Sequence, residues 1–132
     1  MTSDDIADRL VSWAVSEPAL RALWVEGSVP RDVRRPYEAP TFHVAVDEPD
    51  FAAMVDGMGP TLDRLVGGKV LSVADVPRFA KELGVEVEGR GLRLVIERTS
   101  MLAKRPRAHV ATLFDRTGHL AHVLDYSLRS AT

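Results

Sequence analysis

The sequence predicts an α/β fold of the α+β kind, in which a mixed β-sheet carries helices packed on one face. One observation is the order of the segments: a helix, a strand, a loop, a strand and a helix precede a C-terminal half that is mostly strand. A second is the composition, with 45% hydrophobic and 27% charged residues, which is typical of a globular protein. The length of 132 residues fits one domain, which we take as residues 1–132.

Apolar residues at helical spacing predict a helix at the N-terminus. It begins at Ser3, its predicted N-cap, and ends at Glu17, because the residue before a proline is pushed out of the α region. A compact apolar strand is predicted over residues 20–26, and Gly27-Ser28 stops it. The buried stripe of the helix consists of Ile6, Leu10, Trp13 and Ala14.

The middle of the chain predicts a loop, a strand and a helix. Residues 29–40 contain three prolines and three arginines and are typical of a loop. Residues 41–47 alternate between apolar and more polar side chains, which predicts a strand with one apolar face and one more polar face. Asp47 is the predicted N-cap of the next helix, which residues 57–60, with two glycines and a proline, are expected to break.

The remaining segments are shorter, and most of them alternate between apolar and polar residues. Residues 70–73 predict a strand, and Asp75 is the predicted cap of a helix over residues 76–83, closed by Gly84. Alternating apolar residues then predict strands. These strands comprise residues 85–87 and 92–97 and, after a basic connection over 100–107, a hairpin of residues 109–114 and 119–126 around the turn 115–118.

The motifs from the first strand onward follow a recognisable order. A hydrophobic strand runs into Gly27-Ser28, a second strand begins at Thr41, Asp47 leads into a helix, and a late hairpin returns through residues 119–126. This order resembles the nucleotidyltransferase superfamily, particularly the aminoglycoside adenylyltransferases and the minimal nucleotidyltransferases. In that family the loop at Gly-Ser holds the nucleotide phosphates, the next strand carries Asp-x-Asp, and a later strand carries a third aspartate.

The resemblance implies that the metal site of the family is missing here. The family's aspartates hold magnesium, which prefers hard oxygen ligands and bridges the phosphates during transfer. Thr41 and His43 stand where Asp-x-Asp is expected, and His122 stands near the third aspartate. The nearest other carboxylates are Asp47 and Asp125. Residues 74–105 fit the family poorly and are interpreted as a candidate insertion. We therefore expect no magnesium cofactor.

The former active-site cleft is the predicted binding site. Histidines suit zinc, copper or nickel, but two of them without a third ligand make a poor site, so we predict no bound metal. An arginine cluster in the loop is a candidate for attracting an anionic ligand, and the alternative is that these arginines belong to a solvated loop. The cleft candidates are Gly27, Ser28, Thr41, His43 and His122, and the anion-attracting candidates are Arg31, Arg34 and Arg35.

Several functions stay open at this point. The favoured hypothesis is a non-catalytic or repurposed nucleotidyltransferase-fold protein that binds a small molecule or a protein partner through the cleft. The alternatives are an active nucleotidyltransferase, an enzyme of another class with His43 or His122 as general base, and an interaction module that forms a homodimer through a strand edge.

Composition narrows the partners and the location. The chain carries 17 Lys and Arg against 19 Asp and Glu, and its basic clusters have no interleaved aromatic residues, so we expect no nucleic acid partner. No apolar run approaches the roughly 18 residues that span a bilayer, so we expect no membrane partner. The absence of cysteine fits a cytoplasmic protein, which is our expectation for its location.

Overall fold

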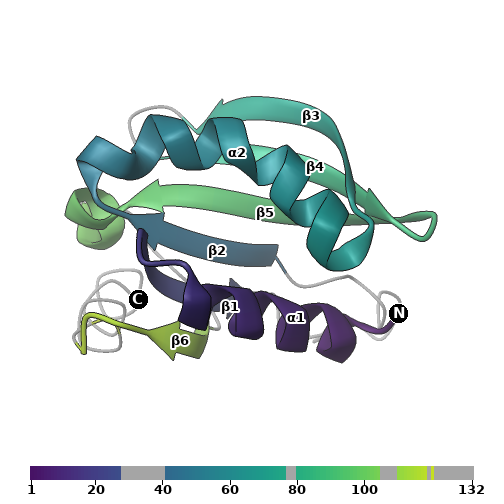
Figure 1. Cartoon of the computed structure of the whole chain (residues 1–132). Coiled ribbons are helices and arrows are strands. Elements are labelled where there is room, and N and C mark those ends of the chain that lie inside the picture. Colours follow the sequence, from purple (N-terminus) through teal and green to yellow (C-terminus); the bar gives the residue numbers. More distant parts are fainter. Residues whose placement is uncertain (28–40, 77–79, 105–109, 119, 121–132) are drawn as a thin grey trace.

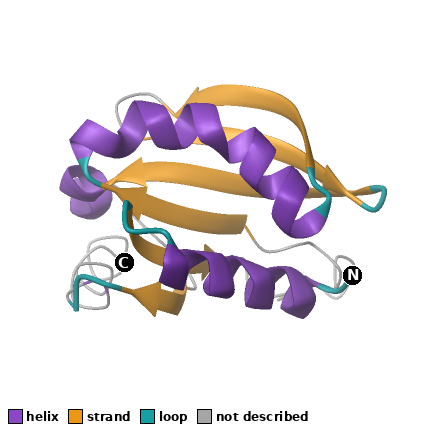
Figure 2. Ribbon diagram, in the orientation of Figure 1, coloured by secondary structure: helices purple, strands orange, loops and turns teal. Residues whose placement is uncertain are grey.

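The computed structural model describes residues 1–27, 41–76, 80–104, 110–118 and 120. In this part of the chain two α-helices pack against a six-stranded mixed sheet, which confirms the predicted α+β class (Figure 1). Both helices lie on the same face of the sheet (Figure 2). The elements are α1 (Ser3–Ser16), β1 (Leu20–Glu26), β2 (Thr41–Val46), α2 (Glu48–Val66), β3 (Lys69–Val76), β4 (Ala80–Val87), β5 (Arg90–Arg98), the 3-10 helix η1 (Thr99–Lys104) and β6 (Val110–Asp115).

The strand order in the sheet is β3-β4-β5-β2-β1-β6. Strands β2 and β5 are parallel, and the other neighbouring strands are antiparallel. The chain passes from β2 to its parallel neighbour β5 through α2 and the β3–β4 pair. Residues 74–105 therefore supply β4 and β5 to the sheet, and their interpretation as an insertion stays a prediction.

Helix α1 is closed at its N-terminus by a capping box. Thr2 is the N-cap, one residue before the predicted Ser3. Its side chain accepts a hydrogen bond from the backbone N–H of Asp5 at 3.1 Å, and the Asp5 carboxylate accepts one from the backbone N–H of Thr2 at 2.8 Å. Two donors that no helical carbonyl can reach are thus satisfied.

Helix α2 is longer than predicted. Asp47 is its N-cap residue, as expected, but the Asp47 side chain accepts a hydrogen bond from the Thr99 hydroxyl at 2.7 Å and does not cap the helix. The prediction that residues 57–60 break the helix was wrong, because Pro60 lies inside it. The helix persists because buried side chains lie on both sides of the proline, and this burial offsets a local cost of about 3 kcal/mol. These buried residues are Phe51, Met58, Leu62 and Val66.

The predicted helix over residues 76–83 was also wrong. Residues 80–87 form strand β4, which pairs with β3 on one side and β5 on the other. Gly84 is not a helix cap, because it lies within β4 and pairs with Ser72 of β3. A Cβ at this position would lie 2.5 Å from the Ser72 hydroxyl, so the close approach of the two strands requires glycine. Alternate residues of β4 are buried against the helix layer, and pairing on both edges overrides local helix propensity. These residues are Leu83, Val85 and Val87.

The sheet separates two apolar clusters. The larger one lies between the sheet and the helices and includes Leu10, Phe42 and Leu94. The smaller one lies on the opposite face and consists of Ala22, Trp24, Ala45, Leu102 and Leu120. Helix η1 supplies Leu102, so this second face is also covered at the β1–β2 end. On these strands, alternate residues point away from the larger cluster and toward the second face of the sheet, which is partly covered.

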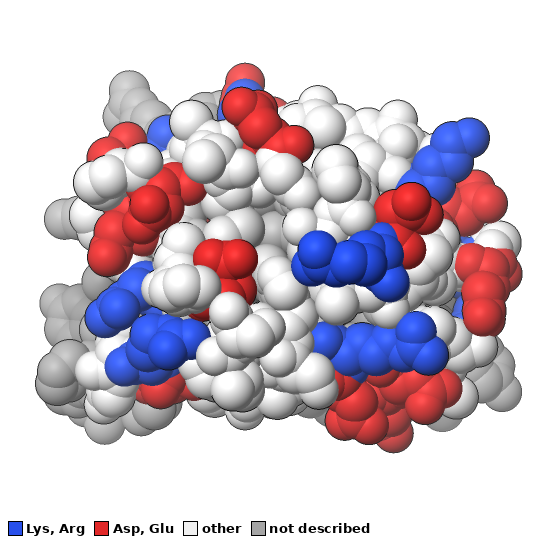
Figure 3. All heavy atoms as spheres, viewed as in Figure 1, with Lys and Arg blue, Asp and Glu red and all other residues white. Residues whose placement is uncertain are grey.

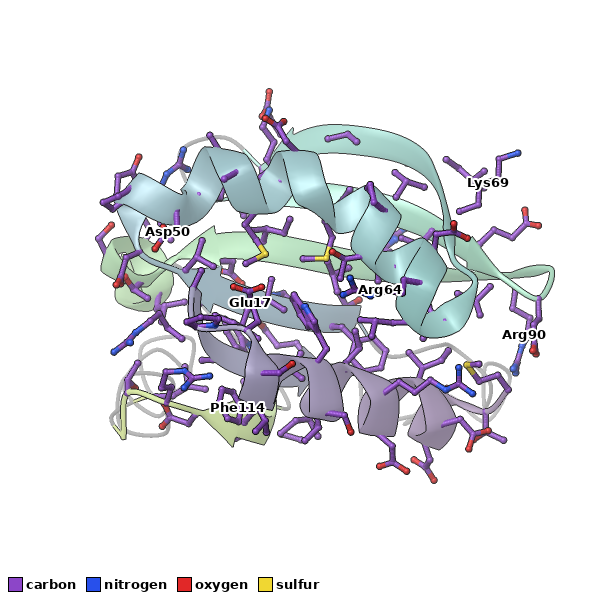
Figure 4. The ribbon with its side chains drawn as sticks, viewed as in Figure 1. Glu17, Asp50, Arg64, Lys69, Arg90 and Phe114 are labelled. Atoms are coloured by element: carbon purple, nitrogen blue, oxygen red, sulfur yellow. The ribbon has the colours of Figure 1, made fainter. Side chains whose placement is uncertain are left out.

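The predicted strand over residues 109–114 is confirmed as β6, and Gly118 has the expected positive φ of 74°. The predicted return strand 119–126 lies outside the described residues except for Leu120, whose backbone is helical. Arg116, just after β6, donates hydrogen bonds to the backbone oxygens of Ala14 and Leu20, both at 3.0 Å. It thereby ties the C-terminal end of α1 to β1, while Phe114 lies beside α1 (Figure 4).

The carboxylate of Asp115 organises the turn after β6. It accepts hydrogen bonds from the Thr117 backbone at 2.9 Å, the Gly118 backbone at 3.2 Å and the Leu120 backbone at 3.0 Å. The Thr117 hydroxyl adds a fourth bond, at 2.6 Å. Burial alone would raise the pKa of Asp115, but these hydrogen bonds outweigh it and hold the pKa below its usual range.

Asp115→Asn is expected to lower the free energy of unfolding by roughly 1 kcal/mol at pH 7. Because the folded-state pKa is lowered, the unfolded chain binds the proton more tightly. The contribution of Asp115 is therefore fully present above the unfolded-state pKa of about 3.9 and is lost as the pH falls below it. Urea unfolding of wild type and variant at pH 7 and pH 3 tests this. A difference between the two proteins that does not shrink at pH 3 would contradict it.

The helical face of the molecule intermixes charges of both signs. Lys and Arg side chains alternate with Asp and Glu side chains across the surface in Figure 3, and Arg98 pairs with Glu48 at 2.6 Å. This face therefore does not present a field of a single sign. Among the described residues, neither α-helix has both the length and the apolar character needed to cross a membrane.

Candidate functional site

A polar cluster lies on the sheet face opposite the α-helices, across the three neighbouring strands β5, β2 and β1. The register explains it. His43 of β2 pairs with Trp24 of β1, and Glu26 is the next β1 residue on the same face. On the other side, Glu97 of β5 pairs with Ala45, the next β2 residue on the face of His43. His43 thus lies between two glutamates, one from each neighbouring strand.

Both glutamates are directed at the same ring nitrogen. The Nδ1 atom of His43 lies 2.6 Å from an oxygen of Glu97 and 3.3 Å from an oxygen of Glu26. The side chain of Glu97 is fully buried, that of His43 is 5% exposed and that of Glu26 is 12% exposed. The cluster is therefore an internal one, with its most accessible member at the end of β1.

Trp24 fixes the orientation of two members of the cluster. Its ring stacks on the imidazole of His43, with 5.3 Å between the centroids and 18° between the planes. Its indole N–H donates a hydrogen bond to Glu26 at 2.9 Å. One buried aromatic residue thus holds both the plane of the imidazole and one carboxylate, which preorganises the cluster.

The donor atoms of the cluster converge closely enough to share one cation. One atom each from Glu26, His43 and Glu97 lies within 4.8 Å of the others. A single Nδ1–H makes one short, straight hydrogen bond, and the shorter contact is the one to Glu97. A cation, in contrast, accepts electron pairs from all three atoms at once. The arrangement can therefore hold a proton or a metal ion between the carboxylates.

The structure brings together only some of the residues that the sequence selects. His43 is the centre of the cluster, and Thr41 begins β2 opposite Glu26 and is half-buried. Gly27 directly follows β1. Asp47, at the other end of β2, contacts Thr99 and lies outside the cluster. The remaining candidates, Ser28, Arg31, Arg34, Arg35, His122 and Asp125, lie outside the described residues.

Sequence reasoning missed Glu26 and Glu97. Glu97 occupies a polar position of an alternating strand, which is usually a solvent-facing position. It is buried because β5 has a neighbour on both sides and because the second sheet face is covered near η1. The available signal was positional: Glu26 immediately precedes Gly27-Ser28 and lies two residues after a tryptophan.

The chain was compared with protein-family models and with curated proteins, and none of them matches it. The likeness to nucleotidyltransferases therefore depends on the motif order alone.

Proposed function

We propose that this protein is a non-catalytic or repurposed domain of the nucleotidyltransferase kind, which binds a small ligand where β1 ends and β2 begins. The observation that carries this proposal is the position of His43. It stands where the family's second aspartate is expected, and Glu26 and Glu97 enclose it. The strand that would supply two metal-binding aspartates supplies Thr41 and His43 instead.

The burial of the cluster favours a binding role. Placing titratable side chains in a protein interior costs free energy that an apolar core of similar volume does not cost. His43 and Glu97 nevertheless occupy the two central strands of a small domain, and both are buried. Three titratable side chains that converge on one point in the interior favour a bound ligand, because a ligand offsets this cost.

The same geometry argues against magnesium-dependent nucleotidyl transfer. Magnesium demands octahedral oxygen coordination and usually keeps several of its waters. The described cluster contributes an imidazole nitrogen and is nearly closed to solvent. Transfer of a nucleotidyl group from a nucleoside triphosphate, with release of pyrophosphate, would also require room for the metal to bridge the phosphates. A site of this kind suits binding better than phosphoryl chemistry.

Calorimetric titration with ATP, with and without magnesium, tests this proposal, together with pyrophosphate release as the measure of transfer. Because the expected aspartates are replaced, we predict that magnesium changes the affinity for ATP less than twofold and that pyrophosphate release stays at the buffer level. Glu26→Gln serves as the variant at the site. Magnesium-dependent pyrophosphate release that this variant abolishes would contradict the proposal and would establish an active transferase.

A further inference from the structure

We propose that Glu26, His43 and Glu97 form a binding site for one first-row divalent metal ion, with Zn²⁺ as the tightest-binding member of the class tested below. This inference deepens the proposed function and rests on it, since it names the ligand class of the same site. The sequence alone predicted no metal, because two histidines without a third ligand make a poor site. The fold supplies two further ligands from β1 and β5.

The donor set selects the class of metal. One imidazole nitrogen and two carboxylates match the ligands that Zn²⁺ accepts in proteins, and three protein ligands leave a fourth position for water or a bound molecule. Mg²⁺ and Ca²⁺ prefer sites made of oxygen alone, so the nitrogen of His43 disfavours them. The chain has no cysteine, which removes thiolate competitors for the softer metals elsewhere in the protein.

The distances fit a site that needs only a small adjustment. Two ligands, each about 2.1 Å from a metal in tetrahedral geometry, lie about 3.4 Å apart. The 3.3 Å between His43 Nδ1 and Glu26 already has this value. The 2.6 Å between His43 Nδ1 and Glu97 is a hydrogen-bond distance, and it must widen by several tenths of an ångström when a metal replaces the proton.

The surroundings hold the ligands in place. Trp24 stacks on His43 and donates its N–H to Glu26, so two of the three ligands are oriented by one side chain. The three ligands come from adjacent strands near the centre of a six-stranded sheet, which is more rigid than a loop. Glu26, which is 12% exposed, lies at the accessible end of the cluster and marks the entry side.

The first test is calorimetric titration of chelator-treated protein with Zn²⁺ and Mn²⁺, in the absence of nucleotide. We expect one ion per chain, with Zn²⁺ bound more tightly than Mn²⁺. Glu26→Gln and Glu97→Gln keep the side-chain volume and remove one ligand each, so each is expected to weaken binding at least about tenfold. Glu82→Gln is the matched control, because Glu82 lies on β4 on the same sheet face and pairs with Arg93.

A second measurement uses the wild-type protein and does not depend on the folding of the two glutamate variants. The chain has two tryptophans, Trp24 at the site and Trp13 on α1, across the sheet. Substoichiometric Mn²⁺ is expected to broaden the indole N–H resonance of Trp24 before that of Trp13. Trp13→Phe assigns the two signals.

Two results would overturn the metal site. One is the absence of saturable Zn²⁺ binding in the wild type. The other is binding that neither glutamate variant weakens relative to Glu82→Gln, which would place the ion elsewhere. Both results are independent of the pyrophosphate assay, so the metal site can fail while the proposed function stands. Magnesium-dependent transfer would instead remove the proposed function.

Discussion

Replacing His43 by alanine is expected to lower the free energy of unfolding by about 3–5 kcal/mol, because the change removes a hydrogen bond to a buried carboxylate and leaves a cavity. His43 lies between Glu26 and Glu97, and its Nδ1 is 2.6 Å from a carboxylate that is fully buried. Without the imidazole, Glu97 loses this hydrogen bond and Trp24 loses the ring on which it stacks. A cavity is also left beneath the second apolar cluster.

Urea unfolding followed by far-ultraviolet circular dichroism measures this effect. Tryptophan fluorescence is less suitable, because Trp24 contacts the substituted residue. Glu82→Ala on the same sheet face is the control, and it is expected to change stability by no more than about 0.5 kcal/mol. A cost of less than about 1 kcal/mol for His43→Ala would contradict the buried hydrogen bond between His43 and Glu97.

Leu94→Ala is expected to cost a similar amount, about 3–5 kcal/mol, for a different reason. Leu94 lies on β5 and is completely buried in the cluster between the sheet and the helices. Truncation removes apolar contacts and leaves a cavity that a close-packed interior refills only in part. The same unfolding measurement gives the value.

Leu71→Ala is the matched control for this substitution. Leu71 lies on the edge strand β3 and is 60% exposed, so the same chemical change is expected to alter stability by no more than about 0.5 kcal/mol. Equal losses of stability at the two positions would contradict the burial of Leu94 between the sheet and the helices.

The periodicity of the sequence was sufficient to predict the N-terminal helix and the first two strands. Helix α1 and strands β1 and β2 were predictable because their apolar residues recur with clear helical or strand periods. Strand β4 was not, because Ala80, Lys81, Glu82 and Leu83 all favour helices locally. Pairing with β3 and β5 decides their conformation, and pairing with distant segments is not visible in a local window.

The residues of the candidate site were likewise predictable only in part from the sequence. His43 was selected because it stands where the motif order of the nucleotidyltransferases places an aspartate. Glu26 and Glu97 were not selected, because polar residues in alternating strands normally face water. Their burial follows from the order of the strands and from the cover near η1, which are properties of the tertiary structure.

The most direct test of the central claim is anomalous diffraction from crystals of the wild-type protein grown with Zn²⁺. The account predicts an anomalous peak roughly 2.0–2.2 Å from Nδ1 of His43 and from one oxygen each of Glu26 and Glu97. Density that shows the 2.6 Å hydrogen bond of His43 to Glu97 unchanged, with no metal between them at a saturating Zn²⁺ concentration, would contradict it.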